Sequence, residues 1–223
     1  MAEKNLGTTY ASLVKALKAR QFSPVYLLMG EEPYYIDKIS DYIANHVMAP
    51  EMRDFNQSVV FGADVTAVQV ADLCREYPMM SEYRVVVVKE AQNLKGWEPI
   101  ERYLDSPVKS TILVICHKNG SIDKRKKIVG KAAAVGVVFE SAKPKDWELP
   151  AFIENYLKAR KATVEPKASQ MIADHVGADL ARLSSELDKV LISLPENDRR
   201  VTPDIVERKI GVSKEFNGFE LRN

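Results

Sequence analysis

A buried strand that runs directly into a helix is indicated by the stretch Pro24-Val25-Tyr26-Leu27-Leu28-Met29-Gly30-Glu31-Glu32-Pro33. Pro33 suits the first turn of a helix, where its missing N–H leaves no hydrogen bond unmade. Nucleotide-binding α/β proteins carry their phosphate loop at such a junction between a strand and a helix. The residues after Gly30 therefore indicate whether the chain can bind a nucleotide in the usual way.

These residues do not form a phosphate loop. The loop reads G-x-x-x-x-G-K-[ST], because backbone N–H groups wrap the phosphates, a lysine neutralises them and a hydroxyl holds Mg²⁺. Here Gly30 is followed by two glutamates, a proline and two tyrosines. Glu31 and Glu32 would satisfy the positive end of the helix dipole and repel a phosphate placed there. We therefore predict a nucleotide-binding architecture without nucleotide chemistry.

Strand-forming segments alternate with helices over residues 1–143. Five strands are expected, at Pro24–Met29, about Asp54–Phe61, Tyr83–Val88, Thr111–Cys116 and Gly136–Glu140. Helices are expected after a cap at Thr8 or Thr9, over Pro33 to about Val47, from a cap at Asp64 to about Tyr77, around Trp97–Leu104 and from Asp123 to about Ala134. Tyr83–Val88 is too uniformly apolar for a half-exposed strand, so it belongs inside a parallel sheet. The pattern predicts an α/β fold with a doubly wound parallel five-stranded sheet.

The pattern changes to helices alone after Ser141-Ala142-Lys143-Pro144-Lys145. Helices are expected over Trp147 to about Arg160, Pro166 to about Val176, Asp179 to about Leu194 and from Thr202 to Gly211. We predict a first domain over residues 1–143 and a small all-α domain over residues 144–212. Residues 213–223 are apolar enough to begin a further domain, which would be missing here; a frayed apolar tail is the alternative.

Composition limits the functions that the chain can have. Its 223 residues include 32 basic and 31 acidic ones, a net charge of +1, so no global field attracts nucleic acid or an anionic membrane. Any contact with DNA must be local. No apolar run approaches the roughly 20 residues that cross a bilayer, and the first residues have no signal-peptide pattern. We expect a soluble, cytoplasmic protein that does not contact a membrane.

Catalytic, cofactor-binding and metal-binding residues are not expected. Cys74 and Cys116 have neither metal nor redox spacing, so we interpret them as reduced, buried thiols. The three histidines are far apart and form no ligand motif. An ATPase of this architecture ends its third strand in an acidic pair that holds Mg²⁺, whereas this strand ends in Lys89-Glu90. No nucleophile motif of the G-x-S-x-G kind occurs.

Two segments remain as candidate binding sites. The basic run Lys124, Arg125, Lys126 and Lys127 could face phosphates or form a solvated helix face. The segment Tyr77-Pro78-Met79-Met80-Ser81-Glu82-Tyr83 places two methionines after a helix-ending proline. Both could pack within a loop, or they could form an exposed apolar contact, because methionine adapts easily to a partner's pocket.

Several of these motifs together resemble the delta subunits of bacterial DNA polymerase III clamp loaders. The resemblance spans nearly the whole chain, in the expected order. The motifs that carry it are Pro24–Tyr35, Asp54-Phe55-Asn56, Tyr77–Val88, Asp123–Lys127, Gly177–Leu180, Glu186–Lys189 and Phe219-Glu220-Leu221.

The resemblance implies an AAA+ architecture, with a RecA-like domain, a small helical lid and a collar domain that would begin at about residue 213. It also implies that Tyr77, Pro78, Met79 and Met80 contact the β sliding clamp, which delta subunits open by inserting an apolar pair. In the family this pair is typically Leu-Phe, so the methionines are a departure in side-chain type. Further implied partners are the gamma/tau and delta prime subunits, through the collar, and primer–template DNA. The chain would be an accessory subunit of the polymerase, without ATP hydrolysis of its own.

Two other functions are compatible with the residues. One is a nucleoside-triphosphatase with an unconventional site. The other is a stand-alone DNA-binding protein that uses Lys124–Lys127.

Overall fold

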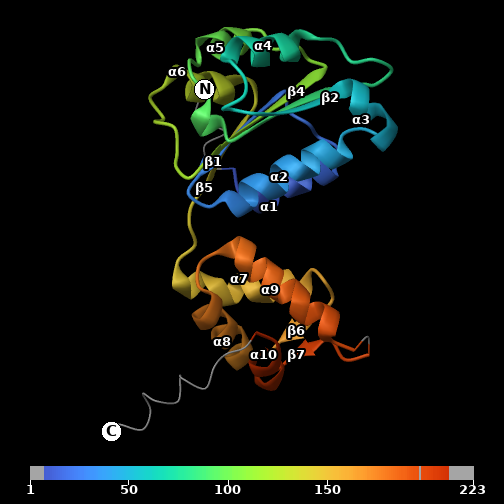
Figure 1. The fold of residues 1–223 in the computed structure, drawn as a ribbon, viewed down its shortest axis with the longest axis vertical. Helices are drawn as coiled ribbons and strands as arrows, with labels where there is room; N and C mark the ends of the chain where they lie inside the picture. The colour runs from blue at the N-terminus through green and yellow to red at the C-terminus, as the bar shows by residue number, and fades with distance from the viewer. Residues whose placement is uncertain (1–7, 196, 211–223) are drawn as a thin grey trace. The chain divides into compact units, whose positions relative to one another are not determined.

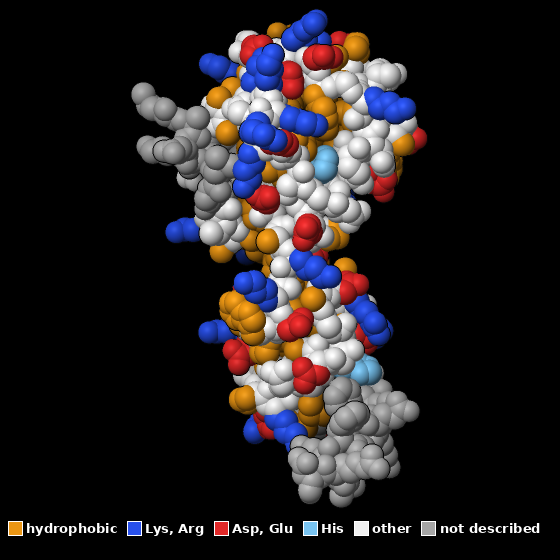
Figure 2. Space-filling view, turned by 90° about the vertical axis from the view of Figure 1, so that its left-hand side faces the viewer, with side chains coloured by type: hydrophobic (Ala, Val, Ile, Leu, Met, Phe, Trp, Pro, Cys, Tyr) orange, Lys and Arg blue, Asp and Glu red, His pale blue; other side chains and the backbone are white. Residues whose placement is uncertain are grey.

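The chain divides into two compact units, Met1–Ala142 and Lys143–Asn223. The computed structural model describes residues 8–195 and 197–210, and Figure 1 shows the elements of each unit. In these two ranges no helix has the length and apolar character needed to span a bilayer. Basic and acidic side chains are interspersed on the face drawn in Figure 2, in keeping with the net charge of +1.

The first unit is built on a sheet of five parallel strands. These are β1 (Val25–Gly30), β2 (Gln57–Phe61), β3 (Arg84–Lys89), β4 (Thr111–Lys118) and β5 (Val137–Ser141). Their spatial order is β2-β3-β4-β1-β5, so β2 and β5 are the edge strands. The predicted α/β fold with five parallel strands is confirmed. Because all strands are parallel, their carboxyl ends meet at one edge of the sheet.

Helices cover both faces of this sheet, as Figure 1 shows. One face carries α1 (Tyr10–Lys18) and α2 (Pro33–His46). The other face carries α4 (Ala67–Arg75), α5 (Glu98–Tyr103) and α6 (Lys127–Val135). The alternation of strand and helix along the chain therefore produces three layers, as expected of a doubly wound sheet.

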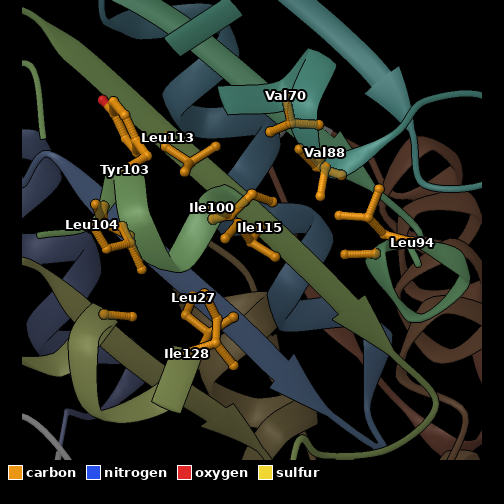
Figure 3. Close-up of a cluster of buried hydrophobic side chains, with 14 of the residues drawn as sticks. Leu27, Val70, Val88, Leu94, Ile100, Tyr103, Leu104, Leu113, Ile115 and Ile128 are labelled. Carbon is orange, nitrogen blue, oxygen red and sulfur yellow. The ribbon is translucent and has the colours of Figure 1, made fainter. Parts of the chain in front are cut away.

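The core of the first unit consists of two apolar layers, one on each face of the sheet. Adjacent residues of a strand enter different layers: Tyr26 packs with α1 and α2, and Leu27 with the opposite helices. Figure 3 shows the layer of Leu27, in which Ile115 of β4 lies near Ile100 of α5, and Leu27 of β1 lies near Ile128 of α6. Because the interior strands are covered on both faces, their sequences show no polar alternation.

The start of β2 and the start of the helix that follows it differ from the prediction. The strand expected from Asp54 begins at Gln57, because Pro50–Asn56 forms a short helix, α3. The helix before Tyr77 is capped by Thr66 rather than by Asp64, because the Thr66 and Gln69 side chains each bond to the other's backbone N–H.

The basic helix also starts later than predicted. Its first residue is Lys127 and not Asp123. The Asp123 carboxylate accepts a hydrogen bond from the backbone N–H of Arg125 at 2.9 Å, which holds these residues in a turn. Most of the basic run therefore lies in a turn before the helix. A 3₁₀ turn, η2 (Ala91–Asn93), follows β3.

The second unit is mainly helical. Its elements are a 3₁₀ turn η3 (Asp146–Glu148), α7 (Leu149–Lys158), α8 (Pro166–Val176), α9 (Leu180–Ser193) and α10 (Pro203–Ile210). The sequence analysis missed one feature, a pair of short parallel strands, β6 (Thr163–Val164) and β7 (Arg200–Val201). Two residues per strand are too few to give a recognisable pattern. The expected start of a further domain at residues 213–223 lies outside the described residues.

Both cysteines are expected to be unreactive in the folded chain. Cys74 and Cys116 are free thiols with no exposed surface, as predicted. Burial raises the pKa of Cys74 to about 12 and that of Cys116 to about 11. Ellman's reagent at pH 8 should therefore label neither thiol in the native chain and both in guanidinium chloride, because the thiolate is the reactive form. Rapid labelling of the native chain would contradict this packing.

Candidate functional site

The junction between β1 and α2 leaves no loop for a phosphate. Only Glu31 and Glu32 lie between the two elements. Gly30, the last residue of β1, pairs with Gly120 through two backbone hydrogen bonds, with N···O distances of 3.0 and 3.1 Å. The φ of Gly30 is +139°, and a Cβ there would lie 2.0 Å from the carbonyl oxygen of Ser141. The junction is therefore packed closely against its neighbours, and two residues are too few to wrap a phosphate.

Glu32 caps the first turn of α2. Its side chain is only 4% exposed, and its Oε1 accepts a hydrogen bond from the backbone N–H of Tyr34 at 2.8 Å. The backbone N–H of Glu32 donates to the carbonyl of Ser141 at 3.2 Å. The next residue, Pro33, has no N–H to offer. A phosphate at this helix start would meet a buried carboxylate, the reverse of the usual anion site.

Lysines stand at the ends of β3 and β4, where an ATPase would need acidic or polar residues. The Nζ of Lys89 lies 2.8 Å from both the Ser40 Oγ and the Asp41 Oδ1. The Nζ of Lys118 lies 2.7 Å from the Asp37 Oδ1. Burial disfavours the charged form of Lys89, but the hydrogen bond to Asp41 and nearby negative charge outweigh it, so its pKa is raised. These cations would repel Mg²⁺.

This ion-pair network was not predicted. The sequence analysis noted Lys89 but not its partners on α2. Asp37 and Asp41 lie four residues apart on that helix, and therefore on one side of it. That spacing, on the helix that follows β1, could have indicated that the two carboxylates pair with lysines at the ends of the neighbouring strands.

The histidines are placed without a ligand site. The His117 Nδ1 lies 2.9 Å from the carbonyl oxygen of Gly120, and His46 stacks on Tyr42 with ring centroids 4.2 Å apart. His175 is half-buried in α8. In the part of the chain that the structure describes, no group of three or more His, Cys, Asp or Glu side chains could hold a metal ion.

The segment between α4 and β3 presents apolar side chains to solvent. Tyr77 is 78% exposed, Met79 62% and Met80 92%, whereas Pro78 is half-buried. Of the two alternatives for the methionines, packing within the loop is excluded by these values. We call Tyr77–Met80 the apolar loop. Large exposed apolar groups that are close in the chain are typical of a contact site for another protein.

Asn56 holds the backbone of the apolar loop. Its Oδ1 accepts a hydrogen bond from the Met79 N–H at 2.6 Å, and its Nδ2 donates to the Met79 carbonyl at 2.9 Å. The Nδ2 also donates to the carbonyl of Met52 at 2.9 Å, within α3. Asn56 is fully buried. The Asn56 side chain therefore forms hydrogen bonds with both the N–H and the carbonyl of Met79.

Arg84, the first residue of β3, anchors the segments around the loop. It is 6% exposed. Its Nε donates to the carbonyl of Leu73 at 2.9 Å, and one terminal nitrogen donates to the carbonyl of Phe55 at 3.3 Å. Its guanidinium also forms an ion pair with Glu76, the residue before the apolar loop. Arg84 thus ties the end of α4 to α3 on the buried side.

Two further features of this site were missed by the sequence analysis. Met80 has a φ of +54°, in the left-handed region that a residue with a side chain seldom adopts. Phe55, which precedes Asn56 in the chain, is 64% exposed and adds an aromatic side chain near the apolar loop. Neither a backbone angle nor the exposure of one aromatic residue can be read from spacing along the chain.

The basic run is exposed, but two of its four members have acidic neighbours. Lys124 lies 2.7 Å from Glu140, and this hydrogen bond lowers the pKa of Glu140. Arg125 lies 2.6 Å from Asp123. Lys126 and Lys127 are exposed at the start of α6. The run is therefore less positive locally than its sequence suggests.

The first unit has a fold of the AAA+ type, with a two-residue junction where a phosphate loop would lie. The RuvB Holliday junction branch migration motor of Thermotoga maritima has a similar fold, with a TM-score of 0.54 and 17% identity over 91% of this chain and 66% of the motor. The chain belongs to the family of DNA polymerase III delta subunits, whose family model matches residues 26–142.

Relatives from Bacillus subtilis agree with this assignment. DNA polymerase III subunit delta of that organism is 28% identical over 220 residues. The structure of the B. subtilis DNA clamp loader delta protein matches 95% of this chain with a TM-score of 0.75 and 26% identity. The chain spans 63% of the length of the first relative and 65% of the second. The resemblance found in the sequence is confirmed.

Proposed function

We propose that this chain is the clamp-binding part of a clamp-loader delta subunit that acts in the cytoplasm. It binds and opens the β sliding clamp of DNA polymerase III, so that the clamp can be loaded onto primed DNA. The observation that carries the proposal is the apolar loop, which exposes Met79 and Met80 on a backbone held by Asn56. The gamma/tau and delta prime subunits are proposed as further partners, through a collar domain.

Side-chain burial supplies the affinity in this proposal. Burying one methionine side chain contributes roughly 1.5–3 kcal/mol. The main chain of Met79 is already fixed, so binding would order little besides side chains, which keeps the entropic cost low. Tyr77 and Phe55 are exposed nearby and would cover the edges of the contact.

The clamp-binding assignment predicts a large effect of removing both methionines. The double variant Met79→Ala, Met80→Ala should lose about 3–6 kcal/mol of binding free energy, or roughly 10²–10⁴ in affinity. Surface plasmon resonance on immobilised β clamp measures this. Ile192→Ala is the matched control, because Ile192 is an exposed apolar residue of the second unit. Wild-type affinity in the double variant would show that the site is elsewhere.

We propose further that the chain neither binds nor hydrolyses ATP. Support comes from the two-residue junction after β1 and from the ion pairs that Lys89 and Lys118 form with α2. Calorimetry with ATP and Mg²⁺ should therefore give no heat of binding at micromolar concentrations. Micromolar binding that is lost in Lys118→Ala would instead identify an unconventional nucleotide site at these lysines.

Lys124, Arg125, Lys126 and Lys127 are proposed to approach primer–template DNA only within the assembled loader. Two of them already have acidic partners, and the net charge is +1. The isolated chain should bind a DNA duplex no tighter than about 10 μM at physiological salt. Fluorescence anisotropy across a salt series tests this, with Lys126→Glu, Lys127→Glu as the comparison. Tight, steeply salt-dependent binding that this variant abolishes would favour a stand-alone DNA-binding protein.

A further inference from the structure

Asn56 is a buried polar side chain that is shared between a helix end and an exposed loop. It lies in α3 and reaches Met79, 23 residues later in the chain, through two hydrogen bonds of 2.6 and 2.9 Å. The carboxamide thus pairs with the Met79 main chain as a neighbouring strand would. Its third bond, to the carbonyl of Met52, is local to α3. Only the two bonds to Met79 connect Asn56 with the apolar loop.

These two bonds bear directly on the exposed methionines. The Met79 side chain leaves a backbone whose N–H and carbonyl are both held. Met80 follows at once, in the left-handed region with a φ of +54°. A residue with a side chain keeps such a conformation only where surrounding contacts enforce it. These two bonds, which we call the Asn56 clasp, fix the residue directly before Met80 and can therefore enforce this backbone turn.

We propose that Asn56 is a positioning residue for clamp binding. It does not touch the clamp itself, but it holds Met79 and Met80 in the conformation that docks. The inference rests on the proposed function of the apolar loop. The physical reason is that a loop without the clasp must be ordered during binding, and ordering even one residue weakens affinity by roughly tenfold.

The alternative is that Asn56 only stabilises α3 and the core beside it. The two roles predict different effects of replacing Asn56 on stability and on affinity for the clamp. Replacing a residue that only stabilises the fold lowers the melting temperature but leaves the affinity of the folded fraction unchanged. A positioning residue changes the affinity, and its effect depends on the side chains that it positions.

The first test needs no binding partner. Hydrogen exchange followed by NMR should show the Met79 amide protected at least tenfold relative to an unstructured peptide, although its side chain is 62% exposed. Exchange at the unprotected rate would overturn the clasp. In Asn56→Ala the protection of Met79 should be lost. In Ser40→Ala it should persist, because Ser40 is equally buried but bonds to Lys89 and α2 instead.

The second test is a double-mutant cycle on the affinity for the β clamp, measured by surface plasmon resonance. Asn56→Ala should weaken binding roughly tenfold in the parent chain. It should have little further effect once Met79→Ala, Met80→Ala has removed the side chains to be positioned. Asn56→Asp serves as a second variant, because it keeps the volume and the acceptor for the Met79 N–H but loses the donor to the carbonyls of Met79 and Met52.

The outcomes separate the two proposals. A parent chain that does not bind the clamp overturns the proposed function, and hydrogen exchange at Met79 then still decides whether Asn56 holds the loop. A parent that binds, with folded Asn56 variants that bind equally well, overturns only the positioning role. An equal loss of affinity with and without the methionine side chains would also overturn it, because Asn56 would then not act by positioning those side chains.

Discussion

The close contact of the end of β1 with its neighbours is the constraint on which the absence of a phosphate loop depends. The backbone of Gly30 is hydrogen-bonded to that of Gly120, and Gly30 lies so near Ser141 that a residue with a side chain would not fit in its place. The chain must therefore turn into α2 within two residues, and Glu32 occupies the helix start that other proteins use for phosphates. The ion pairs of Lys89 and Lys118 complete this change at the same edge of the sheet. What remains is an α/β scaffold without a phosphate loop.

In the proposed function, that scaffold supports clamp binding at the segment between α4 and β3. Exposed apolar side chains normally lower the solubility of a protein. Here buried polar groups, Asn56 and Arg84, fix the main chain around the apolar loop from below. The methionine side chains keep the adaptability that suits them to a partner's pocket. The apolar loop thus combines a main chain held by hydrogen bonds with side chains that can adjust to a partner.

The sheet could be predicted from the sequence because its interior strands are buried on both faces and are apolar without alternation. The missing phosphate loop was equally visible, since its absence is a matter of residue types beside Gly30. Helix α3 was missed because seven residues give no clear repeat, and the cap at Thr66 was missed because Asp64 is as good a cap by type alone. The contact of Asn56 with Met79 could not be predicted, because the two residues lie 23 positions apart in the chain and only folding brings them together.

The clasp has a consequence for how the apolar loop can be recognised. Its conformation depends on α3, on the start of β3 and on the buried carboxamide between them, all of which exist only in the folded first unit. Under the proposed function, the binding determinant is therefore a conformational epitope and not a linear motif. A synthetic peptide of residues 77–83 would lack the clasp, and a search of other proteins for similar short sequences would not find sites that are equivalent in shape.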